Sequence, residues 1–256
     1  MKANTLFWNL LTLRHFLPTL DFLAIIIFLV PTNFLILTAW IKSNGNLKRV
    51  KIDCMYIVIE GQDGTGKSTQ AELLKEYFIK QGKEVALMEE PDGDLPQAHD
   101  LHDLILSRGY HLESLTNVLL FTAARVELWK KIAEPVLKNG GIVISARNYW
   151  STLAYQGYGE GVSRNKIIRL TKEMLPEKYF KPDYGFILTV PDQLREERQK
   201  IRGKAAETFE MKKQDFQSKV NAAYPKIAQD FNLKMVDASG SIEEVFKNIK
   251  DNLLVK

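Results

Sequence analysis

The segment from Met55 to Gln70, MYIVIEGQDGTGKSTQ, constrains the fold of this chain more than any other stretch. Residues 61–68 fit the pattern G-x-x-x-x-G-K-[ST] at every position. Glycines let backbone N–H groups turn inward around an anion, and a helix beginning there adds the positive end of its dipole. The β-branched run Tyr56–Ile59 precedes the pattern and a helical stretch follows it. This context predicts a loop that binds the phosphates of a nucleoside triphosphate, rather than a plain glycine-rich turn.

Two side chains of this loop have defined roles in the chemistry. The lysine reaches the β- and γ-phosphates, and the hydroxyl that follows it ligates Mg²⁺. We therefore expect ATP as the phosphoryl donor, Mg²⁺ as the cofactor and Ser68 as the metal ligand. The predicted ATP-binding residues are Gly61, Gln62, Asp63, Gly64, Thr65, Gly66, Lys67, Ser68 and Thr69.

Residues 55–256 alternate between turn signals and periodic stretches, which predicts an α/β fold with a parallel sheet and helices on both faces. The segment PDGDLP, residues 91–96, is expected to break the chain after the second strand. The expected strands are 56–59, 85–88, 142–144, 185–190 and 233–236. The expected helices are 69–81, 115–137, 208–231 and 242–253.

Residues 1–54 form a hydrophobic N-terminal extension. Residues 22–40 carry no charge, and about 20 apolar residues cross a bilayer as a helix, although PTN at 31–33 interrupts the run. One interpretation is a single membrane span at 22–40, with the basic residues that follow holding the rest of the chain in the cytoplasm. The other is a misassigned start upstream of Met55. A segment packed onto the domain is a more remote alternative, and a cleaved signal peptide fits poorly.

Charge and cysteine content restrict the partners and the compartment. Residues 1–54 carry six basic and two acidic side chains, and the other 29 basic and 29 acidic side chains lie in 55–256. A domain without a basic excess is not expected to bind nucleic acid. The single cysteine, Cys54, excludes an intrachain disulfide and a cysteine-based zinc site, which favours the cytoplasm. A metal site at His99 and His102 is disfavoured.

Beyond the loop, several segments resemble, in the right order, the thymidylate kinase family of P-loop nucleoside monophosphate kinases. The resemblance runs from Met55 to about Lys256. It implies the three-layer P-loop NTPase fold with a five-stranded parallel sheet, phosphorylation of dTMP to dTDP by ATP for dTTP synthesis, and a homodimer. The segments that carry it are Glu60–Gln70, LLFTAAR at 119–125, EPVLKNG at 134–140, AR at 146–147, STLAYQG at 151–157, KPD at 181–183 and VDAS at 236–239.

The resemblance also implies roles for individual side chains in binding the acceptor. Phe121 would stack on the base, and Arg125, one turn on, would hydrogen-bond its polar edge. Tyr155 would crowd a 2′-hydroxyl, Asp63 would bind the 3′-hydroxyl, and Arg147 would grip the phosphate. The residue types alone also allow core packing for Phe121, a surface ion pair for Arg147 and a turn-stabilising role for Asp63. The predicted acceptor-binding residues are Asp63, Phe121, Arg125, Arg147, Tyr155 and Gln156.

Five basic side chains lie close together after Pro191, where the resemblance implies a lid over ATP at about 195–210. The alternative is a solvated helix face. Arg198 and Arg202 are preferred as the lid residues that neutralise charge on the transferred group. The predicted catalytic residues are Lys67, Arg147, Arg198 and Arg202.

Four positions depart from the family pattern. Ala146 replaces the aspartate of a D-R pair, Glu89 replaces the arginine of R-E-P, Thr208 replaces an arginine of the lid, and Thr65 leaves the loop without a basic residue there. These departures do not alter the expected fold, but they bear on rate and acceptor. The alternatives are a kinase for another pyrimidine monophosphate, such as dUMP, and a weakly catalytic nucleotide-binding module.

Overall fold

The computed structural model describes residues 23–25, 39–43, 46–49, 54–91, 93, 95–106, 112–202 and 214–253. The chain divides into two compact units, Met1–Ile52 and Asp53–Lys256. Each unit is described below by itself.

The first unit contains a three-stranded antiparallel sheet in the order β1-β2-β3. Its strands are β1 (Leu23–Ile25), β2 (Ala39–Ser43) and β3 (Asn46–Arg49). Most of the span predicted at 22–40, namely residues 26–38, lies outside the described residues. Among the helices that the structure describes, none has the length and apolar character needed to cross a membrane.

The second unit is built on a five-stranded sheet in the order β5-β6-β4-β7-β8, with every neighbouring pair parallel. The predicted five-stranded parallel sheet is thus confirmed. In β4, residues 56–61 are all buried, as a central parallel strand requires. The strands are β4 (Met55–Gly61), β5 (Val85–Glu89), β6 (Ile142–Ala146), β7 (Tyr184–Thr189) and β8 (Lys234–Asp237).

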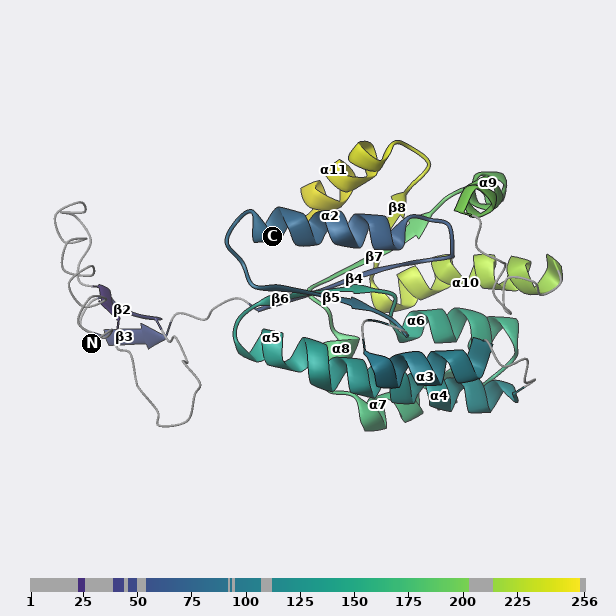
Figure 1. The fold of residues 1–256 in the computed structure, drawn as a ribbon, viewed down its shortest axis with the longest axis horizontal. Coiled ribbons are helices and arrows are strands. Elements are labelled where there is room, and N and C mark those ends of the chain that lie inside the picture. Colours follow the sequence, from purple (N-terminus) through teal and green to yellow (C-terminus); the bar gives the residue numbers. More distant parts are fainter. Residues whose placement is uncertain are drawn as a thin grey trace. The chain divides into compact units, whose positions relative to one another are not determined.

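Helices cover both faces of this sheet, giving three layers (Figure 1). Alternate side chains of β4 enter separate cores: Ile57 and Ile59 pack with α2 (Lys67–Ile79) and α11 (Ile242–Leu253). Tyr56 and Val58 belong to the larger core on the other face. The helices that contribute to this larger core include α3 (Pro96–Leu106), α4 (Ser114–Leu128), α7 (Arg164–Met174), α8 (Glu177–Phe180) and α10 (Gln214–Phe231).

The long helix expected at 115–137 is present, with a change of winding inside it. It consists of α4, a π-helical turn η2 (Trp129–Ala133) and α5 (Glu134–Lys138). A second π-helical turn, η3 (Leu153–Gly159), follows α6 (Tyr149–Thr152). Such turns often occur at functional sites, and η3 carries two of the predicted acceptor-binding residues.

The expected break at 91–96 ends one residue early, because α3 begins at Pro96. Proline suits the first position of a helix, where its missing N–H has no intrahelical partner to lose. The helix expected at 208–231 is seen from Gln214 onward, and residues 208–213 lie outside the described part. The basic segment after Pro191 forms α9 (Asp192–Arg202).

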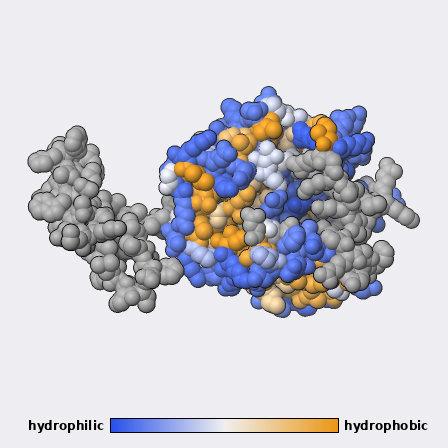
Figure 2. All heavy atoms as spheres, in the orientation of Figure 1, coloured by the Kyte–Doolittle hydropathy of each residue, from blue (hydrophilic) through white to orange (hydrophobic). Residues whose placement is uncertain are grey.

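The sheet also determines where chemistry can occur. All five strands are parallel, so their carboxyl ends meet at one edge, which is where α/β sheets bind ligands. In Figure 2, apolar residues gather over the strands between α2 and α5, as these are located in Figure 1. This patch lies away from the carboxyl ends of the strands.

Candidate active site

The phosphate loop connects the end of β4 to the start of α2. Gly61 has φ +139°, and a Cβ there would lie 2.5 Å from the backbone oxygen of Leu188. Gly66 caps α2 at φ 95°, in the left-handed region that favours glycine. The backbone therefore needs glycine at both ends of the loop, and the loop leads into a helix N-terminus, which is suited to bind an anion.

Lys67 lies folded into the loop. Its Nζ donates to the backbone oxygen of Gln62 at 2.7 Å and lies 3.3 Å from Asp63 Oδ1. The same Gln62 oxygen accepts from Thr65 Oγ1 at 2.8 Å. Burial lowers the pKa of Lys67 to about 8, and the positive charge of Arg147 acts in the same direction. An anion bound in the loop would stabilise the charged form of Lys67 and so oppose the effect of burial on its pKa.

Arg147 and Asp63 form an ion pair between the end of β6 and the loop. The N–H of Arg147 donates to the backbone oxygen of Ile59 at 3.0 Å, and its backbone has φ 80°. A left-handed arginine is strained, and such strain is concentrated at functional sites. Burial raises the pKa of Asp63, but Arg147 and Lys67 more than reverse this effect and lower it to about 2.

Glu60 is a fully buried carboxylate beneath the loop that we did not single out from the sequence. Its Oε1 accepts from the N–H of Asn148 at 2.7 Å, the N–H of Ser151 at 3.1 Å and Ser151 Oγ at 3.0 Å. Burial raises the pKa of Glu60, while Lys67 lowers it. These bonds fix the start of α6 against the end of β4, so Glu60 positions the segment that follows Arg147.

Arg125 of α4 is 2% exposed and is held by a buried carboxylate. Its Nε donates to Glu90 Oε2 at 2.7 Å, and the hydroxyl of Tyr179 donates to the same carboxylate oxygen at 3.0 Å. In the part of the chain that the structure describes, the Nη1 atom of Arg125 is buried without a hydrogen-bond partner. The guanidinium carbon lies 5.8 Å from the centre of the Phe121 ring. The predicted base-binding pair thus lies together.

Glu90 directly follows the last residue of β5, and it is unusual for a carboxylate because it is only 1% exposed. Burial raises its pKa to about 7, although Arg125 and the hydrogen bond from Tyr179 oppose this rise. No sequence pattern identified Tyr179 or Asn148, whose backbone oxygen accepts from Arg125 Nη2 at 3.4 Å. Only the folded chain brings these groups together.

Tyr155 and Gln156 lie on η3. Burial lowers the pKa of Arg147, but Asp63 and then Tyr155 raise it above its usual value, so Tyr155 lies close enough to act on Arg147. The Tyr155 ring is half-buried and lies 6.2 Å from the ring of Phe216 on α10. Within the described residues, the Nε2 atom of Gln156 is buried without a hydrogen-bond partner.

Among the described side chains of helix α9, Arg195 and Gln199 approach the loop. A Cβ on Gly64 would lie 3.1 Å from both Cγ and the backbone oxygen of Arg195. The Gln199 Nε2 atom donates to the backbone oxygen of Asp63 at 3.4 Å. Arg198 is half-buried on the same helix, and the side chain of Arg202 lies outside the described part. Residues 203–210 of the predicted lid also lie outside it.

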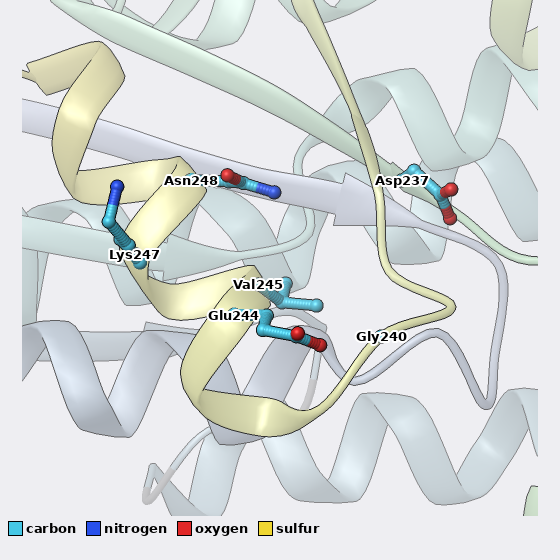
Figure 3. A pocket seen from close by; sticks show the side chains of 6 residues that line it. All are labelled: Asp237, Gly240, Glu244, Val245, Lys247 and Asn248. Carbon is cyan, nitrogen blue, oxygen red and sulfur yellow. The ribbon is translucent and has the colours of Figure 1, made fainter.

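Two other places could hold a ligand but contain none of the predicted site residues. A pocket between β8 and α11 is lined by Asp237, Gly240, Glu244, Val245, Lys247 and Asn248 (Figure 3). Its Glu244 carboxylate accepts from the N–H of Ser241 at 2.8 Å, and Ser241 Oγ accepts from the N–H of Glu244 at 3.2 Å. This is a capping box, so the carboxylate has a structural role at the start of α11.

On α3, ligand atoms of His99, His102 and Asp103 lie within 4.8 Å of one another. The sequence did not lead us to expect that these histidines would gather with an acid. His99 is exposed, His102 and Asp103 are half-buried, and exposed acidic groups are common without a metal ion.

Known proteins resemble this chain over nearly all of the second unit. A sequence model of the family described as thymidylate kinase matches residues 59–249. The thymidylate kinase of Dichelobacter nodosus is 35% identical over 199 residues, covering 77% of this chain and 96% of that protein. The probable thymidylate kinase of Thermococcus onnurineus is 36% identical, covering 76% of this chain and 95% of that protein. The crystal structure of thymidylate kinase from Ehrlichia chaffeensis is similar, with a TM-score of 0.63, 29% identity, and coverage of 78% of this chain and 98% of that one. This chain belongs to the thymidylate kinase family.

Proposed function

We propose that this protein transfers the γ-phosphoryl group of ATP to dTMP and forms dTDP. The observation that carries the proposal is the environment of the Arg125 guanidinium. Its guanidinium is fixed by Glu90 and stacked near Phe121, and Nη1 remains a buried donor without a partner among the described residues. A buried donor strongly favours a ligand that presents an acceptor. The 4-oxo group of thymine is such an acceptor, whereas the 4-amino group of cytosine is not.

The sugar and phosphate of the acceptor would lie between this pair and the phosphate loop. Arg147 would bind the phosphate bidentately, exchanging its contact with Asp63 for one with the ligand. Tyr155, beside Arg147, would favour a deoxyribose, and Asp63 would accept from the 3′-hydroxyl. Gln156 lies next to Tyr155 on η3 and would use its Nε2 donor in the same region.

Phosphoryl transfer asks the protein mainly to align donor and acceptor and to neutralise charge on the moving group. Lys67 and the inward N–H groups of the loop bind the β- and γ-phosphates of ATP. Arg147 holds the attacking phosphate in line, and the arginines of α9 would supply positive charge from the other side. The Ser68 hydroxyl faces the Glu89 carboxylate, and these oxygen donors fit Mg²⁺. Ser68 and Glu89 would hold the ion, which would supply positive charge beside the phosphates of the donor.

The direct test is ADP release by the full chain with ATP and Mg²⁺ against dTMP, dUMP, UMP and dCMP. We expect rapid turnover with dTMP and very little with dCMP. Preference for dUMP over dTMP would instead favour the alternative acceptor, which Ala146 and Glu89 motivate. ATP binding without turnover of any monophosphate would identify a nucleotide-binding module and refute the proposal.

A matched variant separates base recognition from general damage. Arg125→Lys keeps a positive charge beside Glu90 but removes the fork that presents Nη1. We expect the KM for dTMP to rise about 10- to 100-fold, the range of one lost hydrogen bond to a charged group, while the KM for ATP changes little. Lys130→Arg on the exposed side of the same long helix is the control and should leave both constants unchanged.

We also propose that the enzyme is a homodimer in the cytoplasm. Leu119 of α4 is 50% exposed on a largely apolar helix, which supports a subunit interface there. The single cysteine, Cys54, supports a reducing compartment. Sedimentation velocity should give the dimer mass, and Leu119→Glu should shift the protein toward the monomer. A monomeric wild-type protein would refute the interface.

A further inference from the structure

The register of two neighbouring strands connects two of the departures from the family pattern. Ala146 occupies the place of an aspartate, and Glu89 occupies the place of an arginine. These two residues are partners in the parallel pairing of β6 and β5. Partner residues on adjacent strands lie about 4.8 Å apart and point to the same face of the sheet. The side chain of Glu89 therefore starts on the strand next to position 146, where the family pattern has an aspartate.

The Glu89 carboxylate reaches the phosphate loop. Ser68 Oγ donates a hydrogen bond to Glu89 Oε1. Ser68 is the second residue of α2, and its hydroxyl is the predicted Mg²⁺ ligand. The side chain of Glu89 is half-buried, so its contact with Ser68 is partly shielded from solvent.

Among the described residues, three other acids near the loop already have partners within the protein. Glu60 accepts from backbone N–H groups and the hydroxyl of Ser151. Asp63 pairs with two cations, and Glu90 pairs with Arg125. In contrast, over the described ranges Glu89 forms no ion pair, and its hydrogen-bond partner at the loop is a neutral hydroxyl. Of these described carboxylates, Glu89 is therefore the one best placed to supply negative charge to a cation bound beside Ser68.

We propose that Glu89 takes the place of the missing aspartate and completes, with Ser68, the protein side of the divalent-cation site. This inference rests on the proposed binding of ATP with Mg²⁺. Mg²⁺ keeps several of its waters and takes one or two carboxylates in addition to substrate phosphates, so a single glutamate contacting the ion or its water shell is enough. The two substitutions at positions 89 and 146 are then one exchange of a carboxylate between neighbouring strands, rather than two separate losses.

Metal binding without turnover tests this inference. Mn²⁺ replaces Mg²⁺, and the full chain is saturated with the β,γ-imido analogue of ATP in the absence of any acceptor. Free Mn²⁺ is followed by its electron paramagnetic resonance signal. We expect Glu89→Gln to weaken Mn²⁺ binding about 10-fold or more, the usual effect of losing a group that ligates or orients ligands at a metal site. Glu84→Gln, at an exposed position just before the same strand, is the matched control and should bind Mn²⁺ as the wild type does.

The double variant Glu89→Gln with Ala146→Asp tests the exchange itself. We expect it to recover Mn²⁺ affinity to within about threefold of the wild type, since it returns a carboxylate from the neighbouring strand. Wild-type affinity in Glu89→Gln would overturn the proposal, and so would equally weak binding by the single and double variants. Binding of the analogue in EDTA verifies that each variant is folded. Because no acceptor is present, failure to phosphorylate dTMP would refute the proposed function without changing this result.

Discussion

Replacing Glu90 by glutamine tests whether this buried carboxylate is held beside Arg125, the proposed base-binding residue, at a cost in stability. Glu90 is 1% exposed, and its pKa rises from 4.5 to about 7 in the folded protein. Between these values the native state binds more protons than the unfolded state, so stability falls as pH rises. At about 1.36 kcal/mol per unit, the full effect is about 3 kcal/mol, and most of it falls between pH 5 and pH 8.

The assay is urea unfolding of the wild type and of Glu90→Gln at pH 5, 6, 7 and 8. The difference in the free energy of unfolding between the two proteins cancels the titration of every other group. We expect the wild type to lose about 2 to 3 kcal/mol relative to the variant from pH 5 to pH 8. An amide oxygen can still accept from Arg125 Nε and from the hydroxyl of Tyr179, so the variant should fold.

The ion pair with Arg125 forms as Glu90 ionises, so its contribution is already included in the pKa of Glu90 and adds no separate effect. A difference that stays constant within about 0.5 kcal/mol across the series would refute the reasoning. It would mean that Arg125 fully compensates the burial of Glu90. The arginine would then be less available to a ligand than its geometry indicates.

Two further substitutions probe the loop and the support of Arg125. Gly61→Ala should abolish binding of the ATP analogue and lower the Tm, because the new Cβ would lie 2.5 Å from the backbone oxygen of Leu188. Normal binding of the analogue, measured by calorimetry, would contradict this account of the loop. Tyr179→Phe should raise the KM for dTMP several-fold with a smaller change in kcat, since it removes a hydrogen bond to Glu90 worth about 1–3 kcal/mol when buried. The control is Tyr184→Phe, which also loses a hydrogen bond, to the backbone oxygen of Leu253, and should lower stability without altering the KM.

Local patterns in the sequence were sufficient to predict the strands of the sheet and the position of the phosphate loop. Each strand of the second unit has a short apolar run of its own. The glycines of the loop mark positions where the backbone adopts conformations that favour glycine. The closing helix, Ile242–Leu253, was predicted with its observed bounds because its apolar periodicity and its capping residues agree. Helix α3 was missed because Pro96 suits both a turn and the first position of a helix.

Partners distant in sequence could not be predicted in the same way. Glu60 accepts hydrogen bonds from Asn148 and Ser151, which follow it by 88 and 91 positions, and no local sequence pattern predicts such a pairing. The same holds for Glu90 and Tyr179, which are 89 positions apart. Buried polar networks of this kind depend on how the elements pack, so they become visible only in the fold.

Helix α9 shows a finer limit of the sequence analysis. The family resemblance predicted basic residues near ATP but could not say which face of α9 meets the loop. The structure brings Arg195 and Gln199 to Gly64 and Asp63, one helical turn apart on that face. Likewise, Ala146 and Glu89 read as two unrelated departures until the strand register placed them side by side.

The measurement that tests the central claim most directly is the acceptor panel: ADP release by the full chain with ATP, Mg²⁺ and each of dTMP, dUMP, UMP and dCMP. The account predicts that dTMP is turned over with the highest kcat/KM and that dCMP is turned over least, because Arg125 presents a donor to the base. Equal or better turnover of dCMP, or no turnover of dTMP by protein that binds ATP, would contradict it.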